Sequence, residues 1–154
     1  LKNKIAGVAN GRAEFGPRAL GNRSLLADPR EISTKDLVND IKQRQKFRPF
    51  APAILEEHCH DYFDMPDHSR YMSYTYQCTR SDDIPACLHV DNSARVQTVP
   101  ETSNSILRPI LEAWYERTGC PVLLNTSLNV RGKPMVNDWS DAELFSKKYS
   151  VDVF

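Results

Sequence analysis

The segment from residue 105 to residue 125 most constrains the fold, because a helix, a stop signal and a buried strand follow one another directly. Apolar residues at helical spacing predict a helix over 105–118: Ile106, Leu107, Ile110, Leu111 and Trp114. Pro109 falls near the first turn, where a missing amide hydrogen costs little, and Gly119 ends the helix. The apolar run at 121–125 then predicts a buried strand.

The other expected elements alternate in the same way along the chain. Strands or extended segments are predicted over 5–8, 24–27, 50–55, 71–78, 86–90, 95–99 and 151–154, and helices over 34–44, 58–63 and 141–149. Ser33 is the expected N-cap of the helix at 34–44. Strands interleaved with helices predict an α/β fold. The length of 154 residues, without repeat or linker, predicts one domain over 1–154.

A loop rich in glycine and arginine precedes the strand at 24–27. Three glycines and three arginines stand there at irregular intervals: Gly11, Arg12, Gly16, Arg18, Gly21 and Arg23. Glycine allows positive φ or close approach to a ligand, and the guanidinium fork matches a phosphate or a carboxylate. The alternative is a surface turn with solvated arginines. Three arginines among three glycines favour an anion-binding loop.

The three arginines of this loop are expected to divide their roles. Arg18 follows a proline that stiffens the turn, so it is the expected ligand contact. Arg12 and Arg23 are expected to hold the loop in place, through partners such as Glu14 or Asp28.

A second basic cluster follows the helix at 34–44. It contains Lys42, Arg44, Lys46 and Arg48. One interpretation is a solvated helix end with cations against the helix dipole, and we prefer it for Lys46. The other residues are interleaved with Phe47, Pro49 and Phe50, which stiffen the backbone as an anion site requires.

A third group follows the buried strand at 121–125. It contains Asn125, Ser127, Asn129 and Arg131. Ligands of α/β sheets bind beyond the carboxyl ends of strands, where hydroxyl and amide groups can contact phosphate or ribose oxygens. A plain turn explains the same residues equally well.

A fourth candidate is Asp91, within residues 89–95. Its carboxylate suits a Mg²⁺ ion that accompanies a nucleotide, and a salt bridge with His89 or Arg95 is the alternative. Zinc binding at His58-Cys59-His60 is disfavoured, because the spacing fits no tetrahedral pattern.

Composition excludes several function classes. Lysine plus arginine and aspartate plus glutamate both number 20, so no global attraction to nucleic acid or membrane is expected. Neither a P-loop nor a G-x-S-x-G motif occurs. Four scattered cysteines suggest reduced thiols in a cytoplasmic protein. The chain does not begin with Met and lacks an apolar leader, so we expect a cytoplasmic fragment of a longer protein.

Four motif blocks, in this order, resemble the carbamoyltransferase C-terminal domain of the NodU/CmcH family of O-carbamoyltransferases. They are GRAEFGPRALGNRS at 11–24, KQRQKFRPFAP at 42–52, HVDNSARVQ at 89–97 and NTSLNVRG at 125–132. Lys42-x-Arg44 and Ser127-x-Asn129 also resemble the K-x-R and S-x-N signature of YrdC. Three positions depart from the usual family residues, namely Ala13, Asn92 and Leu128, and none removes a polar group.

The resemblance implies a YrdC-like twisted mixed β-sheet with flanking helices and a basic concave cavity. It implies that carbamoyl phosphate and ATP, with Mg²⁺, react there to give a carbamoyl-adenylate. The carbamoyl group then passes to a hydroxyl of a small acceptor in an N-terminal domain of the actin/sugar-kinase type. That domain carries a metal ion and is absent from this chain.

Each candidate residue has a role in such a reaction. Charge on the substrates is screened by the basic residues, which are Arg18, Lys42, Arg44, Arg48 and Arg95. Oxygens of the substrates are bound by Asn125, Ser127, Asn129 and Arg131, and Asp91 helps to place Mg²⁺. The alternatives are an RNA-binding module or a nucleotide-sensing module without catalysis. Neutral net charge and few aromatics beside the basic residues count against RNA.

Overall fold

The strand expected after Gly119 lies at the centre of the main sheet. In the computed structural model, which describes residues 4–154, β8 (Val122–Ser127) pairs antiparallel with β2 (Arg23–Ala27) and β3 (Ala51–Leu55). Beyond them lie β1 (Ile5–Ala9), antiparallel to β2, and β7 (Gln97–Val99), parallel to β3. The order β1-β2-β8-β3-β7 is therefore a mixed sheet, as expected.

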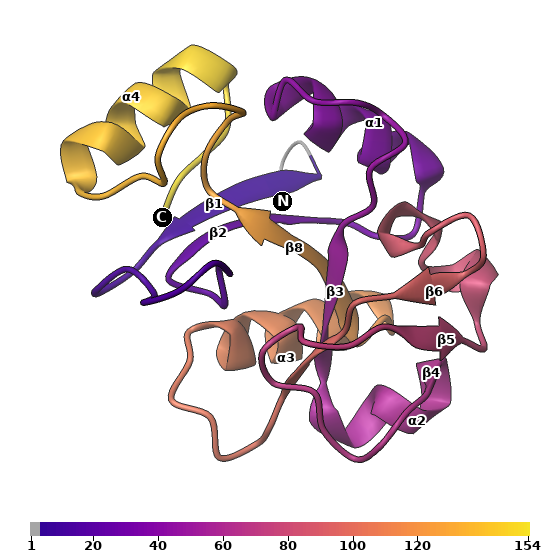
Figure 1. Cartoon of the computed structure of the whole chain (residues 1–154). Coiled ribbons are helices and arrows are strands. Elements are labelled where there is room, and N and C mark those ends of the chain that lie inside the picture. The colour runs from indigo at the N-terminus through magenta and orange to yellow at the C-terminus, as the bar shows by residue number, and fades with distance from the viewer. Residues whose placement is uncertain (1–3) are drawn as a thin grey trace.

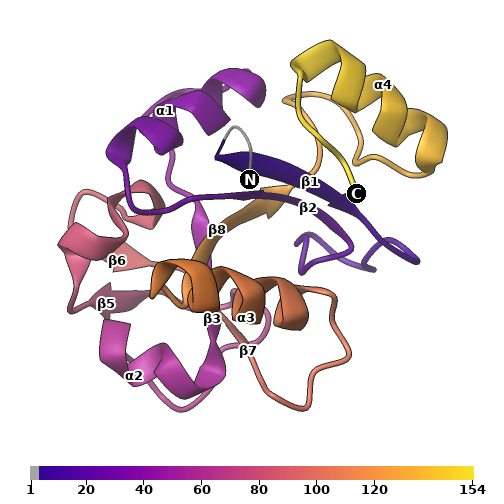
Figure 2. The same ribbon diagram turned by 180° about the vertical axis from the view of Figure 1, so that it is seen from behind.

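Helices cover both faces of this sheet (Figures 1 and 2). Helices α1 (Ile32–Ile41) and α4 (Trp139–Tyr149) pack on one face, where Leu25 and Leu124 join the same core cluster as Val38 and Phe145. Helix α3 (Leu107–Thr118) packs on the other face, in a cluster that includes Leu26 and Leu123 of the strands. Successive strand residues point to opposite faces, so β2 and β8 contribute side chains to both layers.

A smaller sheet lies beside the end of β3. Its strands are β4 (Phe63–Asp64), β5 (Tyr76–Cys78) and β6 (Ser93–Ala94). The 3₁₀ helix η1 (Glu56–His58) and helix α2 (Cys59–Tyr62) connect it to β3, and two further 3₁₀ helices, η2 (Ser81–Asp83) and η3 (Pro85–Cys87), follow β5. Phe63 and Ile84 share a buried cluster with Ile54 and Val122, so the two sheets share a core.

The expected α/β alternation is confirmed, and most differences are at the ends of elements. The strands expected at 5–8, 24–27, 50–55 and 121–125 and the helices at 105–118 and 141–149 are present within a few residues. The segment at 95–99 is β7 preceded by an irregular turn, the helix at 58–63 is η1 and α2, and Val153 at 151–154 forms a single parallel bridge with Gly7.

Four sequence expectations are wrong, each for a local backbone reason. Residues 71–75 of the expected strand are irregular, because Met72 has φ of 55°. Residues 86–90 are not extended throughout, because Pro85 starts η3. The first long helix ends at Ile41, before Gln43 at φ 52°, and its N-cap is Glu31 rather than Ser33.

Arg23 anchors the glycine-rich loop between β1 and β2, although through other partners than expected. Its buried guanidinium donates at 2.8 to 3.1 Å to main-chain carbonyl oxygens of Asn10, Gly11, Asn22, Val136 and Asn137. Glu14 instead accepts from two amides of the loop, and Asp28 pairs with Arg30. The expected carboxylate partners of Arg23 are therefore wrong.

Gly21 lets the loop pass close to the start of α3. A Cβ atom there would lie 2.8 Å from Ser105 Oγ and 2.9 Å from Leu107 Cγ, and φ is +134°. Gly16 has nearly the same φ, +135°, but a Cβ atom there would meet no atom within 4 Å. Substitutions at Gly21 and Gly16 therefore share the same backbone strain, and only the one at Gly21 adds steric overlap.

We expect Gly21→Ala to lower the free energy of unfolding by about 1–3 kcal/mol more than Gly16→Ala does, because only the former overpacks the core. Urea denaturation of the two variants and the unchanged chain measures this difference. Equal losses in both variants would contradict the close packing of Gly21 against α3.

Candidate functional site

Three segments far apart in the sequence enclose a small basic cavity of about 200 Å³. They are the glycine-rich loop, the segment between α1 and β3, and the end of β8, with Met72 and Arg95 completing the wall. Four arginines line the cavity and no acidic residue does: Arg18, Arg44, Arg48 and Arg95. The charged groups of this wall are therefore all cationic N–H donors, which suits a phosphate or carboxylate ligand.

Neutral groups hold Arg44 in the wall of this cavity. Its Nε donates to Asn39 Oδ1 at 2.7 Å, its Nη2 donates to the Pro49 carbonyl at 3.2 Å, and its guanidinium lies 4.2 Å from the centre of the Phe50 ring. The buried Asn39 also donates to the carbonyls of Lys46 and Arg48. Asn39 thus shapes the whole segment between α1 and β3.

The four arginines repel one another in a partly desolvated space. Burial, with Arg48 and Arg95 nearby, lowers the pKa of Arg44 to about 10. Burial and the neighbouring Arg18 lower the pKa of Arg95 as well. A bound anion would relieve this repulsion.

Asn125, which lines the cavity, is hydrogen-bonded to a second buried amide, Gln97, which lies outside the lining. Asn125 Nδ2 donates to the Ala19 carbonyl at 3.1 Å and to Gln97 Oε1 at 2.8 Å. Gln97 Nε2 in turn donates to the Leu20 carbonyl at 3.2 Å. This chain of bonds ties the glycine-rich loop to β7 and β8, on either side of β3.

Lys42 does not line the cavity but lies behind it. Its Nζ donates to the Ser127 carbonyl at 2.6 Å and to the Asn129 carbonyl at 3.0 Å, and contacts Ser127 Oγ and Asn129 Oδ1 at 3.3 and 3.1 Å. Burial, with Arg44 and Arg48 nearby, lowers the pKa of Lys42 from 10.5 to about 7. Lys42 therefore joins the end of α1 to the end of β8.

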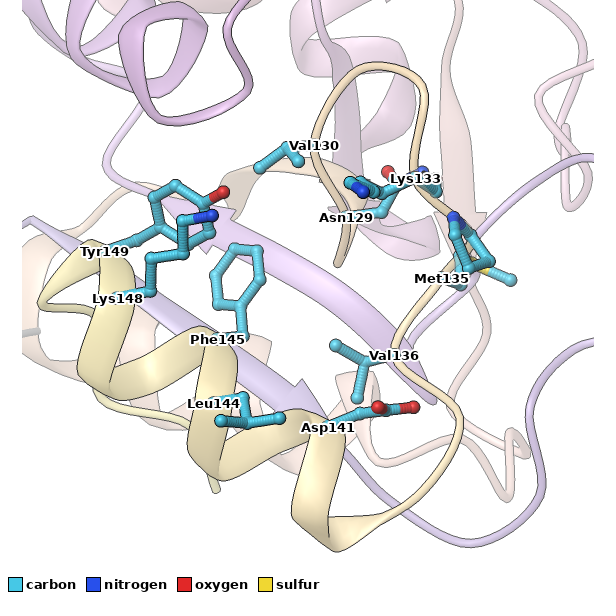
Figure 3. A pocket seen from close by; sticks show the side chains of 11 residues that line it. Asn129, Val130, Lys133, Met135, Val136, Asp141, Leu144, Phe145, Lys148 and Tyr149 are labelled. Atoms are coloured by element: carbon cyan, nitrogen blue, oxygen red, sulfur yellow. Dashed lines mark hydrogen bonds between the residues drawn. The ribbon is translucent and has the colours of Figure 1, made fainter.

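The residues after β8 border a different hollow. Figure 3 shows Asn129, Lys133 and Met135 on one side of it and side chains of α4 on the other. This hollow measures about 260 Å³ and has Val130, Val136 and Phe145 among its apolar lining. Arg131 is exposed on the same segment, and its amide donates to the Lys42 carbonyl at 3.0 Å.

Asp91 is exposed and makes a local turn. Its carboxylate accepts from the Ser93 amide at 3.0 Å and from Ser93 Oγ at 2.7 Å. Within residues 4–154, no three His, Cys, Asp or Glu side chains are grouped as a metal ion would need. His58 and His60 pair separately with Asp61 and Asp67. The described residues thus hold no preformed group of three such ligands, and Asp91 is a single exposed carboxylate.

The structure sorts the sequence candidates into two groups. The cavity brings together Arg18, Arg44, Arg48, Arg95, Asn125 and Ser127. Residues outside its lining are Lys42, Asn129, Arg131 and Asp91. The sequence interpretation missed Asn39 and Gln97, whose importance rests on hydrogen bonds. The sequence marks Asn39 and Gln97 only as polar residues within an expected helix and an expected extended segment.

Within the described part of the chain, each helix is too short or too polar to cross a membrane.

The chain is similar in sequence to several longer proteins. Nodulation protein NolO of Bradyrhizobium diazoefficiens is 43% identical over 144 residues, which cover 90% of this chain and 26% of the relative. The 3'-hydroxymethylcephem-O-carbamoyltransferase of Amycolatopsis lactamdurans is 40% identical over 148 residues, which cover 96% of this chain and 28% of the relative. Nodulation protein U of Azorhizobium caulinodans is 42% identical over 134 residues, covering 86% and 24%.

The chain therefore spans about a quarter of the length of these relatives. The family model described as carbamoyltransferase C-terminus matches residues 1–154. With the motifs, this match shows that the chain belongs to the carbamoyltransferase C-terminal family.

Proposed function

We propose that the arginine cavity binds carbamoyl phosphate and that the domain activates its carbamoyl group with ATP, as part of an O-carbamoyltransferase. The observation that carries this proposal is the convergence of four arginines, without an acidic residue, on one cavity. A relative named as an O-carbamoyltransferase agrees with it.

The size of the cavity favours the small substrate. Pockets for drug-sized ligands measure about 300–1,000 Å³, whereas this cavity holds about 200 Å³. Carbamoyl phosphate combines one phosphate with a carbamoyl group of three non-hydrogen atoms and suits such a space. We infer that ATP extends from the cavity mouth and places only phosphate groups near the arginines.

The proposed formation of the carbamoyl-adenylate has two steps. Water cleaves carbamoyl phosphate to phosphate and carbamate, and a carbamate oxygen then attacks the α-phosphorus of ATP and displaces pyrophosphate. The product is a carbamoyl-adenylate. Arg18, Arg44, Arg48 and Arg95 stabilise charge on the phosphate groups. Ser127 binds a substrate oxygen when its hydroxyl, which donates to Asn129 Oδ1 at 2.6 Å, turns toward the cavity.

We propose that Mg²⁺ accompanies ATP and would be held mainly by the ATP phosphates, with Asp91 as the candidate carboxylate of this chain. Catalysis in this proposal rests on positioning and electrostatics.

The second half of the reaction belongs to the remainder of a longer protein. Because the chain spans about a quarter of its relatives, we propose that an N-terminal domain of the actin/sugar-kinase type receives the carbamoyl group. That domain, with its metal ion, transfers the group to a hydroxyl of a small acceptor. We also propose that the cavity of this chain is YrdC-like and that the protein is cytoplasmic.

Calorimetric titration with carbamoyl phosphate and ATP, separately and together, tests the proposed site. Arg44→Ala should weaken carbamoyl phosphate binding about 10–100-fold, because it removes a charge-assisted contact. Arg117→Ala, on the exposed side of α3, is the control and should leave binding unchanged.

Unchanged binding in Arg44→Ala would contradict the assignment of this site. Binding of ATP alone, without any effect of carbamoyl phosphate, would indicate a nucleotide sensor. Affinity for RNA that falls steeply with salt would indicate a nucleic-acid module.

Lys42 acts in this proposal as a positioning residue, because its Nζ contacts the Ser127 and Asn129 oxygens behind the cavity. With a pKa of about 7 in the folded chain and 10.5 when unfolded, folding releases its proton between these pH values. The unfolded state then binds more protons, so the contribution of Lys42 to the free energy of unfolding rises from pH 7 to pH 10.5.

We expect the Lys42 ¹³Cε resonance to titrate with a midpoint near pH 7, and Lys42→Met to remove the pH-dependent rise in unfolding free energy. Lys46→Met, which changes an exposed lysine of the same segment, is the control. A midpoint near 10.5 would show instead that the surrounding oxygens hold the ammonium form.

A further inference from the structure

Asn125 is the least exposed polar side chain in the lining of the arginine cavity. Only 1% of its surface is accessible, at the point where β8 runs between β2 and β3. Its Oδ1 atom is buried and has no hydrogen-bond partner among the described residues. A buried acceptor without a donor is unfavourable, and this one belongs to a residue that lines the cavity.

The orientation of this amide follows from its neighbours. Asn125 Nδ2 donates to the Ala19 carbonyl and to Gln97 Oε1, while the Gln97 Nε2 group is directed to the Leu20 carbonyl. Exchanging oxygen and nitrogen in Asn125 would set its Oδ1 against two acceptors. The unpartnered atom is therefore the oxygen.

Complementary donors line the same cavity as Asn125. The charged residues of the cavity wall are arginines, whose N–H groups only donate. The Nε–H of Arg95 in this wall is also buried without a partner. The cavity thus combines an unused donor with an unused acceptor, which is the pattern that a primary amide satisfies through its carbonyl and its NH₂ group.

We propose that Asn125 determines specificity by accepting a hydrogen bond from the amino group of the carbamoyl moiety. This inference rests on the proposed binding of carbamoyl phosphate. Arginines bind any phosphate, so they do not distinguish a carbamoyl from an acetyl group. Asn125 Oδ1 does, because a methyl group in place of NH₂ leaves the oxygen unpaired and buried.

Two hydrolytically stable ligands of nearly equal shape test this inference: carbamoylphosphonate and acetylphosphonate. In calorimetric titrations of the 154-residue chain, carbamoylphosphonate should bind at least about tenfold more tightly than acetylphosphonate. Such a difference is expected when the weaker ligand leaves one buried acceptor unsatisfied. Affinities within twofold of each other would overturn the proposal.

Asn125→Leu should abolish this preference, because leucine has the same branching and number of side-chain heavy atoms but no acceptor. Arg48→Ala is the matched comparison, since loss of a guanidinium should weaken both phosphonates by the same factor and keep their ratio. A folded Asn125→Leu chain that retains the tenfold preference would overturn the proposal. Circular dichroism checks the fold of each variant.

If Asn125→Leu does not fold, NMR of the unchanged chain with bound carbamoylphosphonate decides the question. A nuclear Overhauser effect between the ligand NH₂ protons and the Asn125 side chain supports the contact, and its absence overturns it. Failure of the proposed function is distinguishable, because then neither phosphonate, nor inorganic phosphate, nor ATP binds. Equal binding of both phosphonates removes only the role of Asn125.

Discussion

Repulsion among four arginines is the constraint on which the candidate site depends. Arg44 is held by an asparagine oxygen, a main-chain carbonyl and an aromatic ring, none of which neutralises its charge. Carboxylate partners would hold the same geometry but would also compete with an anionic ligand. Neutral partners leave the charge available, at the expense of stability in the empty cavity. An anion that binds only the folded chain would restore that stability.

The sequence predicted those features that depend on neighbouring residues. The helix, Gly119 and strand between residues 105 and 127 follow from apolar spacing and a glycine whose φ is 70°. Arg18, Arg44, Arg48 and Arg95 stand out because they occur in motifs with glycine, proline or aromatic residues. Their convergence in one cavity needed the fold, since three separate segments supply them.

Contacts between distant residues could not be predicted in this way. Arg23 donates to a carbonyl 114 residues away in Asn137, and such main-chain acceptors have no sequence signature. Lys42 and Arg44 both lie just beyond α1, yet only Arg44 lines the cavity. The direction of each side chain depends on where the turn at Gln43, with φ of 52°, sends the backbone. Local periodicity carries no information on that turn.

Lys42 links the charge of the cavity to proton binding. Arg44 and Arg48 contribute to its lowered pKa, so an anion between these arginines offsets part of their repulsion and moves the pKa of Lys42 back toward 10.5. Near pH 7, anion binding should therefore be accompanied by proton uptake at Lys42. The ammonium has three N–H donors for the oxygens of Ser127 and Asn129, whereas the neutral amine has two. Protonation thus favours the arrangement in which Ser127 is held at the cavity while the anion is present.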